Sequence, residues 1–319
     1  MSNTLQGMVL IRPLISIATG TVAVDRNTDL AGAILPPSSI VSDGRKRVVD
    51  PKVFAPMVNI RKSVERAIQK VGSPFVGSHL VPEAKLADLE VILQSKEADF
   101  LTALDELIAH LDQHVHEFAK ANPEWAHLIR NNALNEAMLR ERCAFQVAMF
   151  KPAAPEKDPN GRYSAAVNGA IPAVLADVAG EADDVLKIHF EGTAKAGQRA
   201  VSAVAKLLTK MEGFSILDPR IAPCVQNFKN TLDALPKTGV LKGGDFFALH
   251  GLAKLLTDQE GLLEYGESVF ADLRAPTLAI SLPAVETPPP GPPVQAEAPV
   301  TDASTPPPPS SGPMNWSIF

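Results

Sequence analysis

Hydrophobic residues recur at intervals of three and four through most of the first 274 residues, the spacing of one face of an α-helix. The first clear helix begins after Asp50, an N-cap acid followed by Pro51, and ends before Gly72. Its apolar positions share one face: Val53, Phe54, Met57, Val58, Val64, Ile68 and Val71. This pattern predicts a mainly α-helical protein.

The longest apolar stripe covers residues 82–121 without a glycine or an internal proline. A helix of that length would span roughly 60 Å. Its apolar residues follow at steps of three, four and seven: Leu86, Leu89, Leu93, Phe100, Leu104, Leu107, Leu111, Val115 and Phe118. Asn122-Pro123 starts a second helix that reaches Phe150 and, after so short a connection, should fold back antiparallel. The near-heptad spacing predicts a long antiparallel coiled-coil hairpin across residues 82–150.

Two further parts of the folded body flank this hairpin. Residues 1–50 are the least helical part, and the β-branched runs 14–19 and 21–24 around Gly20 predict a small N-terminal β-hairpin or an edge strand. The apolar spacing in residues 151–274 predicts a C-terminal helical bundle. Its helices are expected within residues 164–213, 221–235 and 245–264.

The composition changes abruptly after residue 274. Residues 275–319 hold 13 of the 28 prolines, three acids and no lysine or arginine. Such a segment cannot bury enough apolar surface to offset the entropy of ordering it, so we predict a disordered, proline-rich C-terminal tail. The predicted organisation is an extended segment (1–50), a helical domain with the hairpin (51–150), a helical bundle (151–274) and the tail (275–319).

The overall composition is that of a protein with an ordinary core: 319 residues, 45% hydrophobic, with a net charge of −6. This charge argues against a general nucleic-acid binder, which needs a basic face to replace counterions. Cys143 and Cys224 lie in apolar helical stretches, so we expect buried free thiols in a reducing compartment. Neither a signal peptide nor a membrane-spanning stretch is evident, and we expect a cytoplasmic protein without a membrane partner.

Two groups of residues offer specific chemistry, and each has a plainer structural explanation. The run 192–199 has the glycine spacing of a phosphate-binding loop, but Gln198 and Arg199 stand where that loop needs lysine and a hydroxyl. The plainer explanation is that its glycines separate helices. His110 and His114 share a helix face and could hold a metal with a third ligand from elsewhere, or lie solvated at the edge of the apolar seam.

A basic run over residues 45–47 could contact phosphate or simply be solvated. The chain contains no motif of a serine hydrolase or zinc protease, and no cysteine is paired with an obvious base. We therefore predict that the protein is not an enzyme, with no catalytic residue, cofactor or metal site.

The last six residues contrast with the tail that carries them. Met314, Trp316, Ile318 and Phe319 are apolar, and exposed aromatic side chains on a disordered segment promote aggregation. We predict that these four residues form a docking tip that fills pockets of a protein partner. Burying both aromatic rings would contribute roughly 8–10 kcal/mol before ordering and association costs. The alternatives are that the tip packs on its own body or has no role.

Several short motifs occur in the order of a known family. They include Gly44–Pro51, Phe75-Val76-Gly77, Asn122-Pro123-Glu124-Trp125, Leu217–Arg220 and Leu235–Gly239. They span most of residues 9–272 and resemble a domain-of-unknown-function family of phages, plasmids and other mobile elements. Members of that family are often encoded near an AAA+ ATPase of the MoxR or cobaltochelatase type and a von Willebrand factor A protein. The family has no established activity, so the resemblance implies partners but no site residues.

These observations together predict a non-enzymatic interaction or adaptor protein of a phage or mobile element, acting in the host cytoplasm. The resemblance implies the AAA+ ATPase and the von Willebrand factor A protein as partners, and the hairpin offers a route to a homo-oligomer. The alternative is a structural or nucleic-acid-associated phage protein whose tail recruits replication or packaging factors, although nucleic acid is the less expected partner.

Overall fold

The computed structural model describes residues 5–25, 28–29, 44–131 and 133–274. Helices make up most of the described chain, which confirms the mainly helical fold class. Residues Met1–Ala275 form one compact unit, and the structure describes none of the remaining residues, 276–319. The predicted tail therefore lies outside the described residues.

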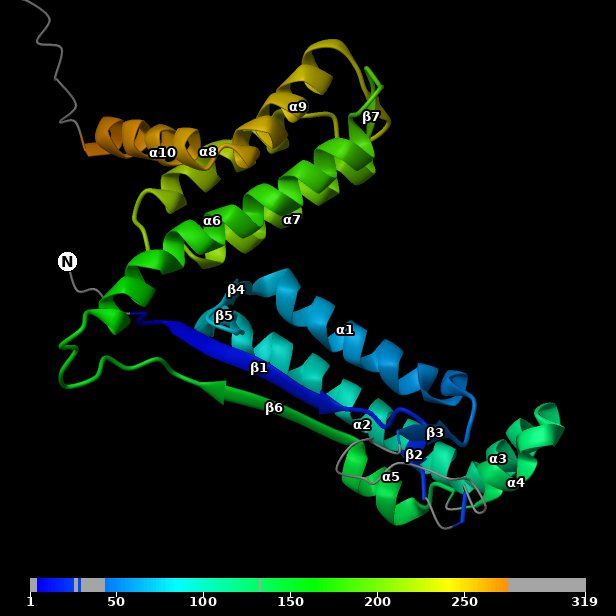
Figure 1. The fold of residues 1–319 in the computed structure, drawn as a ribbon. Helices are drawn as coiled ribbons and strands as arrows, with labels where there is room; N and C mark the ends of the chain where they lie inside the picture. The colour runs from blue at the N-terminus through cyan, green and yellow to red at the C-terminus, as the bar shows by residue number, and fades with distance from the viewer. Residues whose placement is uncertain (1–4, 26–27, 30–43, 132, 275–319) are drawn as a thin grey trace, which may run out of the picture. The chain divides into compact units, whose positions relative to one another are not determined.

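A four-stranded antiparallel sheet with the order β4-β5-β1-β6 gathers segments from far apart in the sequence. Its strands are β1 (Met8–Ser16), β4 (Ser73–Phe75), β5 (Ser78–Pro82) and β6 (Ala144–Phe150). In β1, Ile11 lies opposite both His79 of β5 and Met149 of β6. Figure 1 shows β1 and β6 side by side, and side chains of the sheet pack on α1 (Ala55–Val71) and α2 (Leu86–Ala109).

The start and the end of α1 follow the sequence closely. The Asp50 carboxylate accepts a hydrogen bond from the backbone N–H of Lys52 at the start of η1 (Pro51–Phe54), and α1 continues from there. The helix ends at Gly72, where an added Cβ would lie 2.6 Å from Cγ2 of Val81. A glycine is therefore needed for the chain to pass directly from α1 into the sheet.

The predicted coiled-coil hairpin over residues 82–150 is not formed, because its first arm is broken and its second arm is divided into short helices and a strand. After η2 (Glu83–Lys85) and α2, the backbone leaves helical geometry at His110 (φ −108°, ψ 11°) and resumes in α3 (Leu111–Ala121). The returning segment divides into η3 (Pro123–Trp125), α4 (Ala126–Arg130), α5 (Glu136–Arg142) and β6. Pairing of β6 with β1 over seven residues, which sequence spacing cannot reveal, outweighs the local helical pattern.

The predicted N-terminal strands are present, but they do not pair with each other. Residues 14–16 form the end of β1, whose neighbours are β5 and β6. The run after Gly20 becomes β2 (Thr21–Ala23), which pairs with β3 (Arg45–Arg47) in a separate small sheet. The N-terminal segment is therefore joined to distant parts of the chain.

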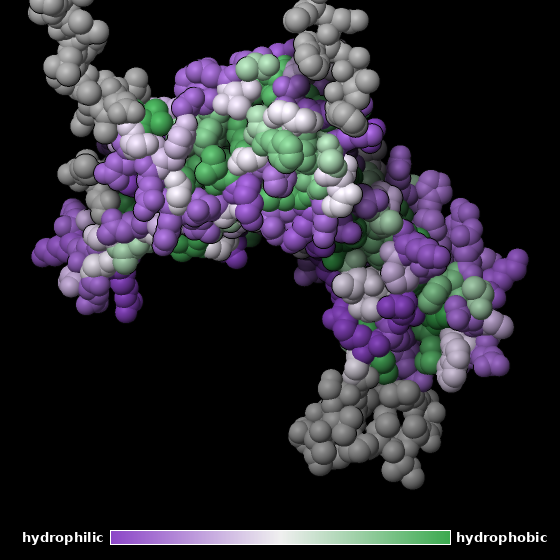
Figure 2. All heavy atoms as spheres, turned by 90° about the horizontal axis from the view of Figure 1, so that it is seen from above, coloured by the Kyte–Doolittle hydropathy of each residue, from purple (hydrophilic) through white to green (hydrophobic). Residues whose placement is uncertain are grey.

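The C-terminal helices share one large hydrophobic cluster. They are α6 (Arg162–His189), α7 (Gln198–Gly213), α8 (Ile221–Ala234), α9 (Gly243–Thr257) and α10 (Gln259–Arg274), with the short pair β7 (Ala196–Gly197) and β8 (Val240–Leu241). The single helix predicted over 245–264 is two helices, since the backbone is extended at Asp258. Phe247 and Leu255 of α9 are exposed, and Figure 2 shows apolar surface among hydrophilic side chains on the side of α8, α9 and α10. None of the described helices has both the length and the apolar character of a membrane span.

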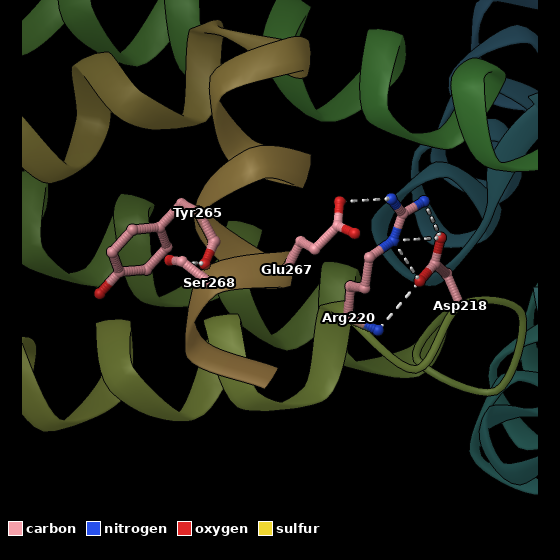
Figure 3. A network of polar contacts seen from close by, with 5 residues as sticks. All are labelled: Asp218, Arg220, Tyr265, Glu267 and Ser268. Atoms are coloured by element: carbon pink, nitrogen blue, oxygen red, sulfur yellow. Dashed lines mark hydrogen bonds and ion pairs between the residues drawn. The ribbon is translucent and has the colours of Figure 1, made fainter. Parts of the chain in front are cut away.

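A charged pair fixes the turn between α7 and α8 (Figure 3). The guanidinium of Arg220 donates to both carboxylate oxygens of Asp218, at distances between 2.8 and 3.2 Å. Burial alone would raise the pKa of Asp218, but these hydrogen bonds and the charge of Arg220 hold that pKa below its usual range. Arg220 also faces Glu267 of α10 across 3.8 Å, so the turn is tied to the last described helix.

Candidate functional site at the open edge of the sheet

The residues that the sequence singles out for docking are not among those the structure describes. Met314, Trp316, Ile318 and Phe319 all lie outside the described residues. The remaining sequence-based candidates do have described positions.

The two histidines lie at the junction of α2 and α3, with ring centroids 6.4 Å apart. Nδ1 of His110 lies 2.9 Å from the backbone oxygen of Glu106, so one ring nitrogen already has a partner in the last turn of α2. Across the described ranges, no three His, Cys, Asp or Glu side chains converge as metal ligands. His110 and His114 therefore have no described third ligand beside them.

The glycine run 192–199 forms the connection into α7. Gly197 belongs to β7, and α7 begins at Gln198. Nε2 of Gln198 donates to the backbone oxygens of Pro236 and Gly239, at 3.0 and 3.2 Å. The side chain at the supposed phosphate-binding position thus holds the loop before β8.

The basic run 45–47 forms β3, and two of its cations are engaged within the fold. Arg45 donates from Nε to the hydroxyl of Thr21 and from Nη2 to the backbone oxygen of the same residue. The ammonium of Lys46 bonds the buried carboxylate of Asp29 and the backbone oxygen of Asn131. These contacts give the run a structural role.

Both thiols are buried and unpaired, as the sequence predicts. Burial raises the pKa of Cys224 to about 12 and also raises the pKa of Cys143. A thiol with such a pKa stays protonated at neutral pH and is a poor nucleophile. Neither cysteine has the environment of a reactive residue.

A polar group built around two buried side chains lies where β4 meets α6 and α7, and the sequence patterns do not reveal it. The hydroxyl of Ser73 donates to the Asp177 carboxylate at 2.7 Å. The ammonium of Lys210 lies 2.6 Å from oxygens of both Asp177 and Glu181. Ser73 is fully buried and Lys210 is 4% exposed, so both side chains have their polar partners within the fold. This group joins secondary-structure elements.

The open edge of the sheet is accessible along β6. Within the described chain, β1 is the only strand that pairs with β6. The N–H of Ala144 donates to the hydroxyl of Ser16 in β1 at 3.1 Å, and the register continues unbroken to Phe150. Because successive N–H groups point to opposite sides of a strand, Phe145, Val147 and Met149 direct their N–H and C=O groups away from β1.

A groove of about 530 Å³ runs along this edge between β6 and α2. We call it the edge groove. Its lining comprises Leu14, Glu90, Leu93, Gln94, Glu97 and the β6 residues 145–149. Glu90 and Glu97 give its α2 side a negative charge, and the lining contains no cation. The groove therefore offers unpaired backbone groups, an apolar floor and an acidic wall.

The sequence contains a signal for this strand that the helical interpretation overlooks. Large apolar residues at Phe145, Val147 and Met149 alternate with Gln146 and Ala148, which is the period of a strand. The same stretch also fits the spacing of a helix face, and seven residues are too few to separate the two patterns. The partner strand lies more than a hundred residues away in the sequence.

A family model described as "Protein of unknown function (DUF3150)" matches residues 5–258. This range agrees with the span of the motifs on which the family resemblance rests. No curated protein and no solved structure matches the chain.

Proposed function

The chain belongs to the DUF3150 family of proteins of unknown function, and we propose that it is a non-enzymatic interaction or adaptor protein that receives a partner strand in the edge groove. The observation that carries this proposal is the open edge of β6. There the outward N–H and C=O groups of Phe145, Val147 and Met149 face no strand of the described chain.

An unpaired apolar edge is a template for another chain, because a strand gains a full row of hydrogen bonds when it pairs there. Each new backbone hydrogen bond contributes about 1 kcal/mol net. The apolar floor adds burial, since Phe145, Val147 and Met149 are only partly buried in the free protein. These contributions support binding of moderate strength.

The acidic wall of the edge groove indicates the chemistry of the partner. Glu90 and Glu97 would face one side of an added strand, and the lining has no positive charge to balance them. A segment with apolar residues on its floor side and Lys or Arg beside α2 would complement this field. We therefore propose an extended, basic segment of a protein partner as the occupant.

The family resemblance supplies candidates for that partner. We propose that the protein works in a phage or mobile element with the AAA+ ATPase of the MoxR type and the von Willebrand factor A protein. The docking tip, Met314, Trp316, Ile318 and Phe319, would provide a second contact. Two linked contacts bind more tightly than either alone, because the first raises the effective concentration of the second.

The test is co-precipitation of the full chain with the AAA+ ATPase and the von Willebrand factor A protein from the same genome. In Val147→Pro the outward N–H is lost, while the bonds of β6 to β1 remain. Val147→Ala removes most of the side chain but keeps the N–H, and is the matched control. We expect the proline variant to lose a partner that wild type and the alanine variant retain.

A second arm deletes residues 314–319 and should weaken the same complex. If Val147→Pro remains folded and binds both proteins as strongly as Val147→Ala, the edge of β6 is not the docking site. If neither protein binds the wild-type chain, the proposed partners are wrong.

A further inference from the structure

A second cavity, separate from the edge groove, opens where α1, α2 and α7 converge and has a volume of about 650 Å³. Each helix turns one face to it at helical spacing. The lining comprises Ser63, Arg66, Ala67, Lys70 and Val71 of α1, Lys85 of η2, Asp88, Leu89 and Ile92 of α2, and Lys206, Thr209, Lys210 and Gly213 of α7. The volume is in the range of sites that bind small organic molecules.

Cations dominate the polar lining. We call Arg66, Lys70, Lys85 and Lys206 the basic rim; the fifth cation, Lys210, is already neutralised by Asp177 and Glu181. The only carboxylate in the lining is Asp88, so the rim keeps an excess of positive charge. Within the described chain, no member of the rim has a carboxylate oxygen within ion-pairing distance. Among the described residues, the guanidinium of Arg66 donates one hydrogen bond, to the backbone oxygen of Lys62.

The basic rim is unusual in a chain with a net charge of −6. Like charges held on converging helices repel one another, and a cavity with low-dielectric walls strengthens the local field. A bound anion would relieve this repulsion.

One wall of the cavity is apolar. Ala67, Val71, Leu89 and Ile92 form an aliphatic wall between the cations. Ile92 is 43% exposed although it points into a lined cavity, so part of its surface is open to a ligand. A simple inorganic anion would leave this wall wet, whereas an organic anion would cover it.

We propose that this cavity binds a nucleoside polyphosphate, with its phosphates on the basic rim and its nucleoside along the aliphatic wall. Lysine and arginine are the residues that hold clustered phosphates, and the hydroxyl of Ser63 adds a polar contact for the sugar. A single-stranded nucleic acid fits less well, since such proteins stack bases on aromatic side chains and this lining contains none.

The experiment is titration of the full chain with ATP, followed by calorimetry, beside titrations with inorganic triphosphate, adenosine and an oligothymidine. We expect ATP to bind more tightly than triphosphate or adenosine. The double variant Lys70→Gln/Lys206→Gln should weaken ATP binding by about tenfold or more, because two charge-assisted contacts are lost. Ile92→Ser should weaken ATP binding but leave triphosphate binding unchanged.

The matched control is Lys120→Gln/Lys254→Gln, which makes the same change in charge on exposed parts of α3 and α9. It should bind ATP like wild type. The proposal is overturned if this control loses as much affinity as the rim variant, or if triphosphate binds as tightly as ATP. Binding of the oligothymidine but not of ATP would also overturn it, in favour of a nucleic-acid site.

Discussion

At the scale of single residues, the turn between β4 and β5 contains the one described non-glycine residue with a positive φ, Val76. Phe75 pairs with Ser78, so Val76 and Gly77 alone make the turn. Their φ angles are 48° and 70°, as a tight hairpin turn requires. Gly77 accepts this conformation freely, but a β-branched residue does not. Val76 is also 74% exposed, so burial of its side chain offsets little of this strain.

We predict that Val76→Asn stabilises the protein by about 1 kcal/mol, because asparagine tolerates positive φ and favours this turn. Urea unfolding followed by circular dichroism measures the change. Val76→Ala, which relieves the branching but not the positive φ, should fall between wild type and the asparagine variant. A loss of stability in Val76→Asn would mean that the valine side chain has a packing role.

At the scale of secondary-structure elements, prediction from the sequence succeeds where local chemistry decides. Asp50 and Pro51 mark the start of the first helix correctly, because capping involves neighbouring residues only. Prediction fails where distant pairing decides. Residues 144–150 carry a spacing compatible with helix, and only the register with β1 makes them a strand. The candidate site at the edge of β6 depends on the same distant pairing, so the spacing of apolar residues does not predict it.

The break at His110 has a different origin. Spacing of apolar residues continues across it, so the stripe alone predicts one helix. Leu107 and Leu111 on either side of the break both enter the same hydrophobic cluster, together with Ile129 of α4. Packing of α3 against α4 favours a change in the direction of the helix at His110. No single residue in the sequence indicates this change.

Packing between helices gives a matched pair of glycines for an element-scale prediction. Gly266 lies where α10 packs against the turn shown in Figure 3. A Cβ added at Gly266 would lie 2.8 Å from the backbone oxygen of Arg220. Gly251 of α9 has nothing within 4 Å of the same position. Both glycines are inside helices, so only their surroundings differ.

We predict opposite effects for the two alanine variants. Gly266→Ala should destabilise the protein by about 1–3 kcal/mol, because α10 must move away from the α8 turn. Gly251→Ala should stabilise it by about 0.5–1 kcal/mol through helix propensity. Both values come from thermal or urea unfolding under the same conditions. Equal effects of the same sign would show that α10 does not pack on Arg220 as described.

At the scale of the whole molecule, the described chain holds several hydrophobic clusters and a few polar connections between them. Leu5, Met8 and Leu80 of the N-terminal half belong to the cluster of the C-terminal helices, so the parts share a core. The sequence could not reveal this, because apolar periodicity gives the faces of elements but not their partners. The group of Ser73, Asp177, Glu181 and Lys210 reinforces the same junction with charge.

This junction gives the last prediction. Lys210→Met keeps an apolar side chain of similar length but removes the ammonium, which leaves Asp177 and Glu181 without their cation. We expect the free energy of unfolding to fall by about 2–4 kcal/mol, a little below the range for fully buried pairs because both carboxylates retain some exposure. Lys187→Met, which breaks an exposed pair with Asp183 in the same helix as Asp177, should change it by less than about 1 kcal/mol. Urea unfolding measures both.

A double variant separates the charge from the hydrogen bond. Adding Asp177→Asn to Lys210→Met should recover part of the lost stability, because one uncompensated charge disappears. An additive further loss of stability would instead assign the effect to the hydrogen bond from Ser73.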